Sequence, residues 1–249
     1  MTALIVTDVN MRTFAERYSE LEERFRQQAK SDCYIYLPNV RPYAPVDFVF
    51  IAMEPSRRGW AKSREEAEAR IARGFRNFIT SVDALTLHFS IRRFLCKEEQ
   101  TYHITDISKG VMWTREAYQG RQERYDCWYL LLCDELALVA KPSAKVFAIG
   151  KCVEHFLLKK GFSPRPVPLL HYSTQAARFR KECVRGREEE FQRFAATVSL
   201  DNIRQVAEEI IAEAQLPREK YDDFLNRLKE GDLSNSRKEL IFCYKTELG

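Results

Sequence analysis

Four apolar segments of this chain each end abruptly at small, polar or ionisable side chains. They are DFVFIAMEPS at 47–56, YHITDISKG at 102–110, AKVFAIGK at 144–151 and VPLLHYST at 167–174. Continuous apolar runs of this length are typical of strands that are buried on both faces of a parallel sheet. Because ligands of open α/β sheets bind at the carboxyl ends of the strands, we expect the side chains after these runs to line one cleft.

Glu54 follows the first of these runs. Pro55 and Ser56 end the strand and begin a turn, and backbone amides exposed in such a turn can hold an anion or a water. A carboxylate at this place, beside Met53 and Trp60, can orient a water for attack on a substrate. The alternative role is structural, because a carboxylate at a strand end can cap the turn that follows.

His171 follows the fourth run. A histidine at a buried strand end can donate a hydrogen bond to a developing anion. Ser173, Thr174, Arg178 and Arg180 come after it, and hydroxyl and guanidinium groups are common phosphate contacts. A core histidine bonded to a carbonyl is the alternative, but the polar residues that follow favour a loop that faces a ligand.

Asp106 closes the second run and is followed by Ser108 and Lys109. A carboxylate at this strand end can accept hydrogen bonds from the edge of a base or from a sugar. Capping of a turn or a helix is again the alternative. The third run ends at Gly150, which marks the passage from a strand to a helix.

The composition limits the class of protein. The chain has 249 residues, 45% hydrophobic and 31% charged, which suits a globular protein with a sizeable core. No apolar window reaches about 18 residues, so we expect no membrane span and a cytoplasmic protein (nucleoid-associated in a prokaryote). P-loop, dinucleotide, G-x-S-x-G and H-E-x-x-H motifs are absent, which removes several common enzyme templates.

Metals and cofactors are not expected from the residues available. The seven cysteines are scattered and form no C-x-x-C pair, which argues against zinc and iron–sulfur sites. Most of them lie beside apolar residues and are interpreted as reduced core thiols. Three of the four histidines are interpreted as packing or surface residues, namely His88, His103 and His155.

The net charge of +4 is unevenly distributed along the chain. Basic clusters lie at 57–64, 69–76, 91–97 and 177–187, and aromatic side chains such as Trp60 are interleaved with them. This pattern suits a phosphate backbone together with base stacking. Solvated helix faces explain the same pattern equally well, because runs of charge mostly indicate exposure.

Helical periodicity between the four strands predicts an α/β fold with three layers, α/β/α, around a central four-stranded parallel sheet. Helical extensions are expected at both the N- and the C-terminus. Residues 1–199 would form the α/β domain, and residues 200–249 a helical appendage. Further helices are expected at 11–30, 63–72, 77–96, 122–140, 152–161 and 185–198.

Together, the four strand ends resemble those of the uracil-DNA glycosylase superfamily. AMEPS at 52–56 resembles the motif that positions the catalytic water, with Glu54 in the place of the catalytic Asp or Asn. HYS at 171–173 resembles the H-P-S motif, whose His stabilises the departing base and whose loop enters the DNA minor groove. Asp106 stands where the family has a base-reading Asn. The likeness covers about residues 45–197.

The resemblance implies an enzyme that flips a nucleotide out of DNA and hydrolyses its N-glycosidic bond without metal or cofactor. Uracil is not implied as the base, because an ionised Asp106 offers only acceptors, which suit an edge with two donors; a protonated Asp106 is the alternative. The Gly74-Phe75 pair resembles the segment that supplies the stacking aromatic. The implied residues are Glu54 and His171 for catalysis, Asp106, Met53, Phe75 and Phe78 for the base, and Ser56, Lys109, Ser173, Thr174, Arg178 and Arg180 for DNA.

Two other functions stay open at this level. The first is a glycosylase-like module that binds single- or double-stranded nucleic acid without cleaving it, since three motif positions are substituted. The second is an interaction protein whose helical residues 200–249 recruit a protein partner.

Overall fold

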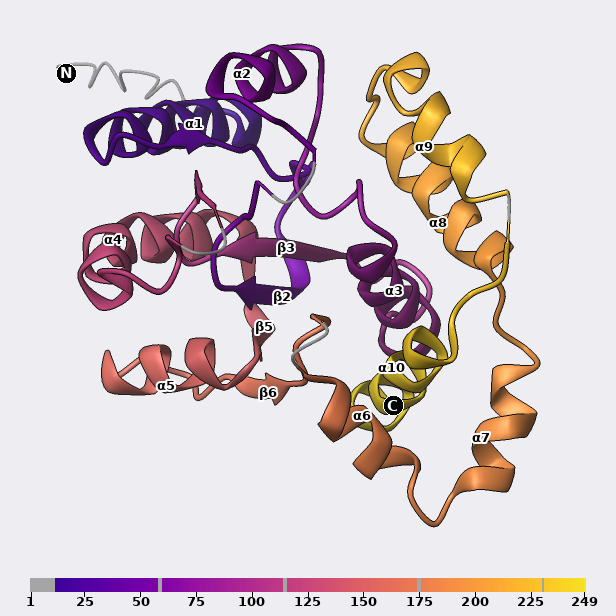
Figure 1. Ribbon diagram of the computed structural model, residues 1–249. Coiled ribbons are helices and arrows are strands. Elements are labelled where there is room, and N and C mark those ends of the chain that lie inside the picture. Colours follow the sequence, from indigo (N-terminus) through magenta and orange to yellow (C-terminus); the bar gives the residue numbers. More distant parts are fainter. Residues whose placement is uncertain (1–11, 58–59, 114–115, 174–175, 230) are drawn as a thin grey trace, which may run out of the picture.

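A parallel sheet of four strands lies at the centre of the computed structural model (Figure 1). The structure describes residues 12–57, 60–113, 116–173, 176–229 and 231–249. The strand order is β3-β2-β5-β6, and neighbouring strands are parallel throughout. The strands are β2 (Val46–Ala52), β3 (Tyr102–Asp106), β5 (Ala140–Ile149) and β6 (Val167–Leu169). The expected three-layer α/β fold is therefore confirmed.

Alternate residues of β2 serve the cores on the two faces of the sheet. Val49 and Ile51 pack with one set of helices, whereas Phe48 and Phe50 pack with the other. Successive side chains of a strand point to opposite faces, so a strand buried on both faces must be apolar throughout. The helices over the first face are α1 (Phe14–Ser31), α4 (Arg121–Val139) and α5 (Lys151–Lys159); those over the second include α3 (Val82–Ser90) and α10 (Asn235–Leu248).

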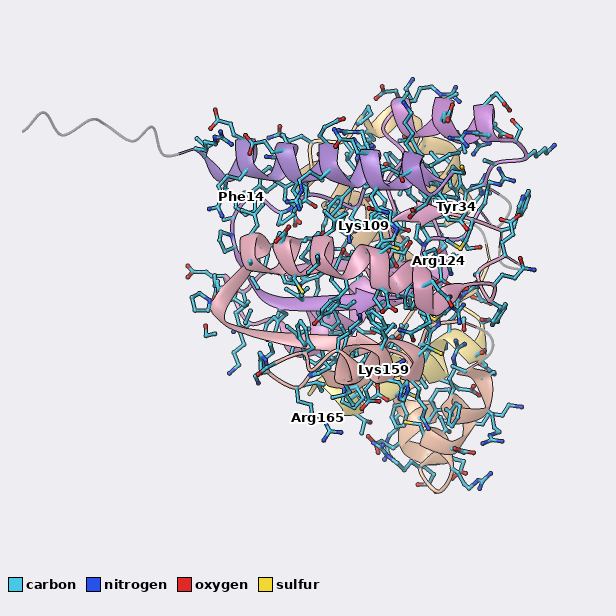
Figure 2. The ribbon with its side chains drawn as sticks, turned by 90° about the vertical axis from the view of Figure 1, so that its left-hand side faces the viewer. Phe14, Tyr34, Lys109, Arg124, Lys159 and Arg165 are labelled. Atoms are coloured by element: carbon cyan, nitrogen blue, oxygen red, sulfur yellow. The ribbon has the colours of Figure 1, made fainter. Side chains whose placement is uncertain are left out.

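The first face is covered by helices that lie side by side, as the side view in Figure 2 shows. α1 begins at a complete capping box, in which Thr13 and Glu16 satisfy each other's backbone N–H groups. Its buried stripe of Tyr18, Leu21 and Phe25 follows the expected spacing of three and four residues. This stripe packs in the same core as Trp128 of α4.

A second core lies beyond α3, away from the sheet. The helices that build it with α3 and α10 are α7 (Glu188–Ala195), α8 (Leu200–Glu213) and α9 (Asp222–Arg227). α10 joins the two cores, because Leu240 and Tyr244 pack on the sheet side whereas Ile241 and Phe242 face the second core. The helical prediction for residues 200–249 is confirmed. The boundary at residue 199 stays a prediction, and α10 packs in the same core as β2.

Short elements complete the chain. Two of them, β1 and β4, form a small antiparallel pair beside the main sheet. Among the described residues no helix is both long enough and apolar enough to cross a membrane. The remaining elements are β1 (Ile35–Tyr36), α2 (Arg64–Ala72), the π-helical turn η1 (Ile91–Leu95), β4 (Gly110–Val111), α6 (Ala177–Val184) and the 3-10 turn η3 (Arg218–Lys220).

Two expected helices are shorter or broken in the structure. The helix predicted at 77–96 begins only after Ser81, whose hydroxyl caps α3, and Phe78 before it has a φ of 65°. The helix predicted at 185–198 is confirmed as α7 but is shorter, because it begins only at Glu188. Gly186, with a φ of 76°, separates it from α6, which the sequence did not predict, since a left-handed residue cannot continue a right-handed helix.

The carboxyl ends of the strands meet at one edge of the sheet. Ala52 of β2 lies opposite Asp106 of β3, and Ile149 of β5 lies opposite Leu169 of β6. The N–H of Gly150 donates to the carbonyl of Leu169 at 2.8 Å, which fixes the end of β5 against the end of β6. The segments that follow β2, β3 and β6 are thereby brought together.

Candidate functional site

A cavity of about 260 Å³ lies at this carboxyl edge. Segments after β2, β3 and β6 contribute to its wall, together with the segment before α3 and the start of α4. This is where open α/β sheets bind their ligands. The sequence-predicted residues that line it are Met53, Glu54, Ser56, Phe75, Phe78, Asp106, His171 and Ser173.

The carboxylate of Glu54 is held by donors from the first turns of α4. Arg121 Nη2 lies 2.8 Å from Oε1, the Tyr125 hydroxyl donates to Oε2, and Arg124 Nη2 is 3.8 Å from Oε2. Burial and then Glu54 raise the pKa of Tyr125, which keeps the phenol protonated and able to donate. Only 5% of the Glu54 side chain is exposed. The Glu54 carboxylate therefore lies at the cavity wall in a fixed orientation, paired with the guanidinium of Arg121.

Asp106 is fully enclosed at the end of β3. Asn77 Nδ2 donates to Asp106 Oδ2 at 2.6 Å. Burial raises the pKa of Asp106 well above its usual value, and the charges of Glu54 and Glu135 add to the rise, against the opposing effects of Lys109 and Asn77. A neutral carboxylic acid offers one O–H donor and one carbonyl acceptor, like a primary amide.

Lys109 is committed to other partners than the side chain of Asp106. Its Nζ forms an ion pair with Glu135 Oε2 at 2.9 Å and donates to the main-chain carbonyl of Asp106 at 2.7 Å. His103 Nε2 lies 3.1 Å from Glu135 Oε1. Burial raises the pKa of Glu135, but Lys109 and His103 outweigh it and lower the pKa overall. Lys109 is buried, and Figure 2 shows it between α1 and α4.

A chain of buried amides and hydroxyls supports Asp106 from behind. Asn77 Nδ2 also contacts Asn39 Oδ1 at 3.2 Å, and Asn39 Nδ2 donates to Thr105 Oγ1 at 3.1 Å. Thr105 in turn donates to Glu135 Oε2 at 2.9 Å. Sequence reasoning missed these residues, although Glu135, which with Asp134 interrupts the apolar part of a predicted helix, is a usable signal of a buried polar network.

His171 has a defined tautomer in its neutral form. The backbone N–H of Ser173 donates to His171 Nδ1 at 2.9 Å. A neutral imidazole that accepts at Nδ1 carries its proton on Nε2, so Nε2 is the donor. Gly150 lies against the ring, because a Cβ added there would come within 3.3 Å of His171 Cδ2. The φ of 87° at Gly150 adds a second reason for glycine at this position.

Arg180 positions the loop that carries His171. Its guanidinium donates to the carbonyls of Tyr172 at 2.6 Å and of Ser173 at 2.5 Å, and also to Ser236 Oγ at 3.0 Å. The residue is 2% exposed. The prediction that Arg180 contacts DNA is therefore wrong for this conformation, since the guanidinium is turned inward to the protein backbone.

Lys109 is a second correction among the predicted DNA contacts, because it is buried in the ion pair with Glu135. Arg178 behaves differently. Its side chain is 80% exposed, and its Nε lies 3.5 Å from Glu182 Oε1. Ser56 and Ser173 lie at the cavity. Thr174 lies outside the described residues.

Two aromatic rings form a flat wall of the cavity. Trp60 and Phe75 stack with their ring centroids 4.4 Å apart and their planes 22° apart. The Trp60 indole N–H donates to the carbonyl of Ser56 at 2.8 Å, which fixes the stack to the turn after β2. Phe78 is buried and lines the same cavity. Aromatic walls of this kind bind flat rings by stacking.

Comparison with protein-family models, with curated proteins and with solved structures found no match to this chain. The described residues hold no group of three or more His, Cys, Asp or Glu side chains placed to bind a metal ion.

Proposed function

We propose that the cleft binds a nucleobase flipped out of DNA and hydrolyses the bond between that base and its sugar. The observation that carries the proposal is the convergence of Glu54, Asp106 and His171 with a stacked aromatic pair around one cavity. A flipped base needs a flat apolar wall and polar groups for its edge. The cavity supplies both, and it lies where the strand-end motifs of the sequence come together.

Cleavage of an N-glycosidic bond builds positive charge on the sugar and negative charge on the departing base. His171 suits the second charge, because its neutral ring already carries a proton on Nε2 and can donate a hydrogen bond to the departing base. Glu54 suits the first charge. Its oriented carboxylate stabilises an oxocarbenium-like sugar electrostatically while the glycosidic bond breaks and its electron pair leaves on the base. Water then adds to the anomeric carbon, and the proton that it loses passes through solvent to the base anion.

Asp106 would read the base as a neutral acid. Because Asn77 donates to Oδ2, that oxygen is the carbonyl-type acceptor and the proton belongs on Oδ1. A donor beside an acceptor matches a lactam edge, in which a ring N–H adjoins a carbonyl. Uracil and hypoxanthine have such an edge. An ionised Asp106 would instead suit the two adjacent donors of guanine.

The second candidate is a module that binds a base without cleaving it. The observation in its favour is the binding of both Glu54 oxygens by Arg121 and Tyr125. A carboxylate held in this way is a weak base for activating water, so the site would rely on electrostatics alone.

Base release separates the two candidates. The substrates are single- and double-stranded oligonucleotides that carry uracil, hypoxanthine, xanthine or an alkylated base, and free base is detected by mass spectrometry. We expect release by the wild-type protein, and its loss in Glu54→Gln and in His171→Ala with DNA binding retained. Binding without release from any substrate would favour the module, whereas release by both variants at the wild-type rate would contradict the proposed roles.

A further inference from the structure

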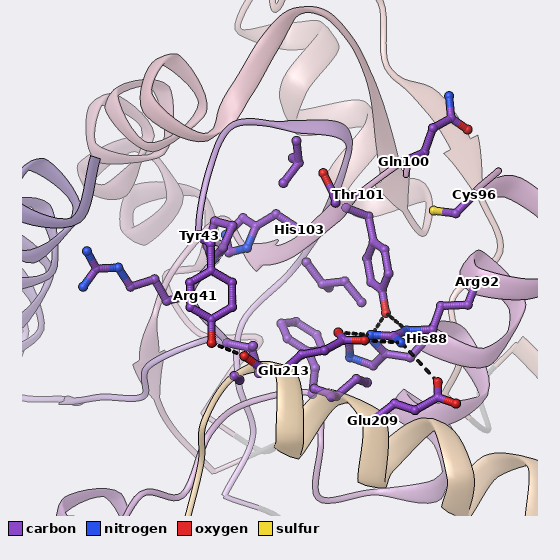
Figure 3. A pocket seen from close by; sticks show the side chains of 18 of the residues that line it. Arg41, Tyr43, His88, Arg92, Cys96, Gln100, Thr101, His103, Glu209 and Glu213 are labelled. Atoms are coloured by element: carbon purple, nitrogen blue, oxygen red, sulfur yellow. Dashed lines mark hydrogen bonds and ion pairs between the residues drawn. The ribbon is translucent and has the colours of Figure 1, made fainter. Parts of the chain in front are cut away.

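A larger cavity, of about 620 Å³, lies at the amino end of β3. Its walls come from residues 40–46, from α3 and η1 with the segment up to Ile104, and from the end of α8. In Figure 3, Arg41 and Tyr43 lie on one side of this amino-end cavity, and Arg92 and Cys96 on the other. Asn77 and Phe78 line both cavities, but the polar groups of the cleft at the carboxyl edge do not reach this one.

The charged side chains of the amino-end cavity balance one another. Three cationic residues, Arg41, Arg92 and Lys97, and three anionic residues, Glu98, Glu209 and Glu213, line it. Arg92 Nη1 contacts Glu209 at 3.2 Å and Glu213 at 2.9 Å, and Nη2 contacts Glu213 at 2.6 Å (Figure 3). The guanidinium is saturated by carboxylates, so this wall does not favour a phosphate or another anion.

His88 is a polar residue of the cavity wall that takes no part in these ion pairs. It is 5% exposed, and burial together with Arg92 lowers its pKa to about 3, which leaves the ring neutral. His88 Nδ1 lies 2.7 Å from the hydroxyl of Tyr102, and that hydroxyl accepts from Arg92 Nε at 3.1 Å. Burial raises the pKa of Tyr102 to about 12, so the phenol keeps its proton.

The tautomer of His88 follows from these contacts. Tyr102 accepts from Arg92 and therefore directs its own proton to His88 Nδ1, which places the ring proton on Nε2. Among the described residues, His88 Nε2 has no hydrogen-bond partner although it is buried. A buried N–H without an acceptor is unfavourable, and a ligand that offers one would relieve this.

We propose that the amino-end cavity binds a neutral, ring-containing small molecule that presents a carbonyl or an unprotonated ring nitrogen to His88 Nε2. The volume falls in the range of small-molecule sites. The apolar part of the wall, which includes Val40, Val46, Ile104 and Ile210, provides the contact for the body of the ligand. This site is separate from the glycosidic chemistry proposed for the cleft.

Three probes of one shape test the ligand class on the full chain: quinoline, which has an acceptor, naphthalene, which has none, and 2-naphthoate, which is an anion. Binding is followed by NMR on protein labelled with ¹⁵N in histidine. We expect quinoline to bind and to shift the His88 Nε2–H resonance, and naphthalene and 2-naphthoate to bind about tenfold more weakly or not at all. Equal affinity for quinoline and naphthalene, or no binding of quinoline, would overturn the proposal.

Two variants assign the binding to this cavity. His88→Phe keeps a ring and removes the donor, and we expect it to lose the preference for quinoline over naphthalene. Ala44→Phe places a bulky group at an exposed position on the cavity wall, so it should weaken all probes and stay folded even if His88→Phe does not. Quinoline binding that is unchanged in Ala44→Phe would place the probe elsewhere and contradict the proposal.

Discussion

The cleft at the carboxyl edge of the sheet and the amino-end cavity of β3 differ in the ionisable group that is left outside their ion pairs. In the cleft, Glu54 pairs with Arg121, whereas the side chain of Asp106 is held by the neutral amide of Asn77. In the amino-end cavity, carboxylates and guanidinium neutralise each other, and a neutral histidine is left over. On the proposed functions, the larger cavity binds a neutral ligand, whereas the smaller cleft holds the carboxyl groups of Glu54 and Asp106 in fixed orientations for chemistry.

The largest expected effect comes from the charge of Glu54. Replacing Glu54 by Gln keeps the size of the side chain but removes the negative charge that faces the sugar. We expect the rate of base release to fall about a thousandfold. Exposed Glu123, on the same helix as Arg121, is the matched control, and Glu123→Gln should release base at the wild-type rate. Rapid release by Glu54→Gln would remove the main distinction between the two cavities.

The buried ion pair between Lys109 and Glu135, which supports the cleft, can be removed by a single substitution. Glu135→Gln leaves Lys109 buried without its carboxylate, and we expect a loss of about 3 kcal/mol in the free energy of unfolding. Asp134 is adjacent in sequence but pairs with Arg24 at the surface, where both side chains are about half exposed. Asp134→Asn should therefore cost less than about 1 kcal/mol. Chemical denaturation measures both, and equal losses would show that the Lys109–Glu135 pair does not support the site.

Two arginines of α6 sharpen the assignment of the His171 loop. Arg180→Met removes the donors to the carbonyls of Tyr172 and Ser173, and we expect about tenfold slower base release at saturating DNA. Arg178→Met should leave the rate at saturation unchanged. It should weaken DNA binding and reduce the salt dependence of that binding by about one phosphate contact.

A purely structural role for Arg180 would lower the melting temperature without moving the resonances of the His171 ring. We expect those resonances to shift in Arg180→Met, because the Ser173 N–H that fixes the tautomer is carried by the same loop. Unshifted His171 resonances together with normal release would contradict the positioning role.

The smallest effect, and the most specific one, concerns the proton on Asp106. A raised pKa in the folded state means that the neutral acid contributes its full stability below the unfolded pKa and loses it as the pH rises through the folded pKa. Asp106→Asn has no proton to lose. We therefore expect the variant to become more stable than the wild type as the pH rises, by on the order of 1 kcal/mol in the free energy of unfolding. Melting temperatures measured across the pH range would show this as a growing difference between the two proteins.

Burial of Asp106 sets the direction of this pH dependence, and the groups that face its side chain modify it. Glu54 and Glu135 oppose ionisation, whereas Lys109 and the amide of Asn77 favour it. The base preference should follow the same titration, with lactam bases released more slowly as Asp106 ionises. Parallel melting curves for wild type and Asp106→Asn at every pH would show that Asp106 is already ionised.

The sequence was sufficient to predict the site residues that directly follow the ends of strands. Four apolar runs predicted the parallel sheet, and the register of parallel strands then places Glu54, Asp106 and His171 at one cavity. Periodicity alone could not find the break before α3, because Phe78 is apolar and fits a helix pattern while its backbone is left-handed. That break is what brings Asn77 to Asp106.

Side-chain partners were the least predictable part. Arg180 and Arg178 have the same residue type and lie two positions apart, yet one is buried and the other is exposed. Their roles depend on where α10 places Ser236, far away in the sequence. The same holds for Lys109, because its partner Glu135 lies in α4, later in the sequence. Charge patterns predict exposure by default, and only tertiary contacts reveal the exceptions.

The most direct test of the central claim is a single-turnover measurement of free base released from double- and single-stranded oligonucleotides that contain uracil or hypoxanthine, with wild type beside His171→Ala. We expect release by the wild type and a loss of about a hundredfold or more in the variant, at unchanged DNA affinity. Release that is equal in the two proteins, or absent from every substrate, would contradict the claim that this cleft cleaves the glycosidic bond.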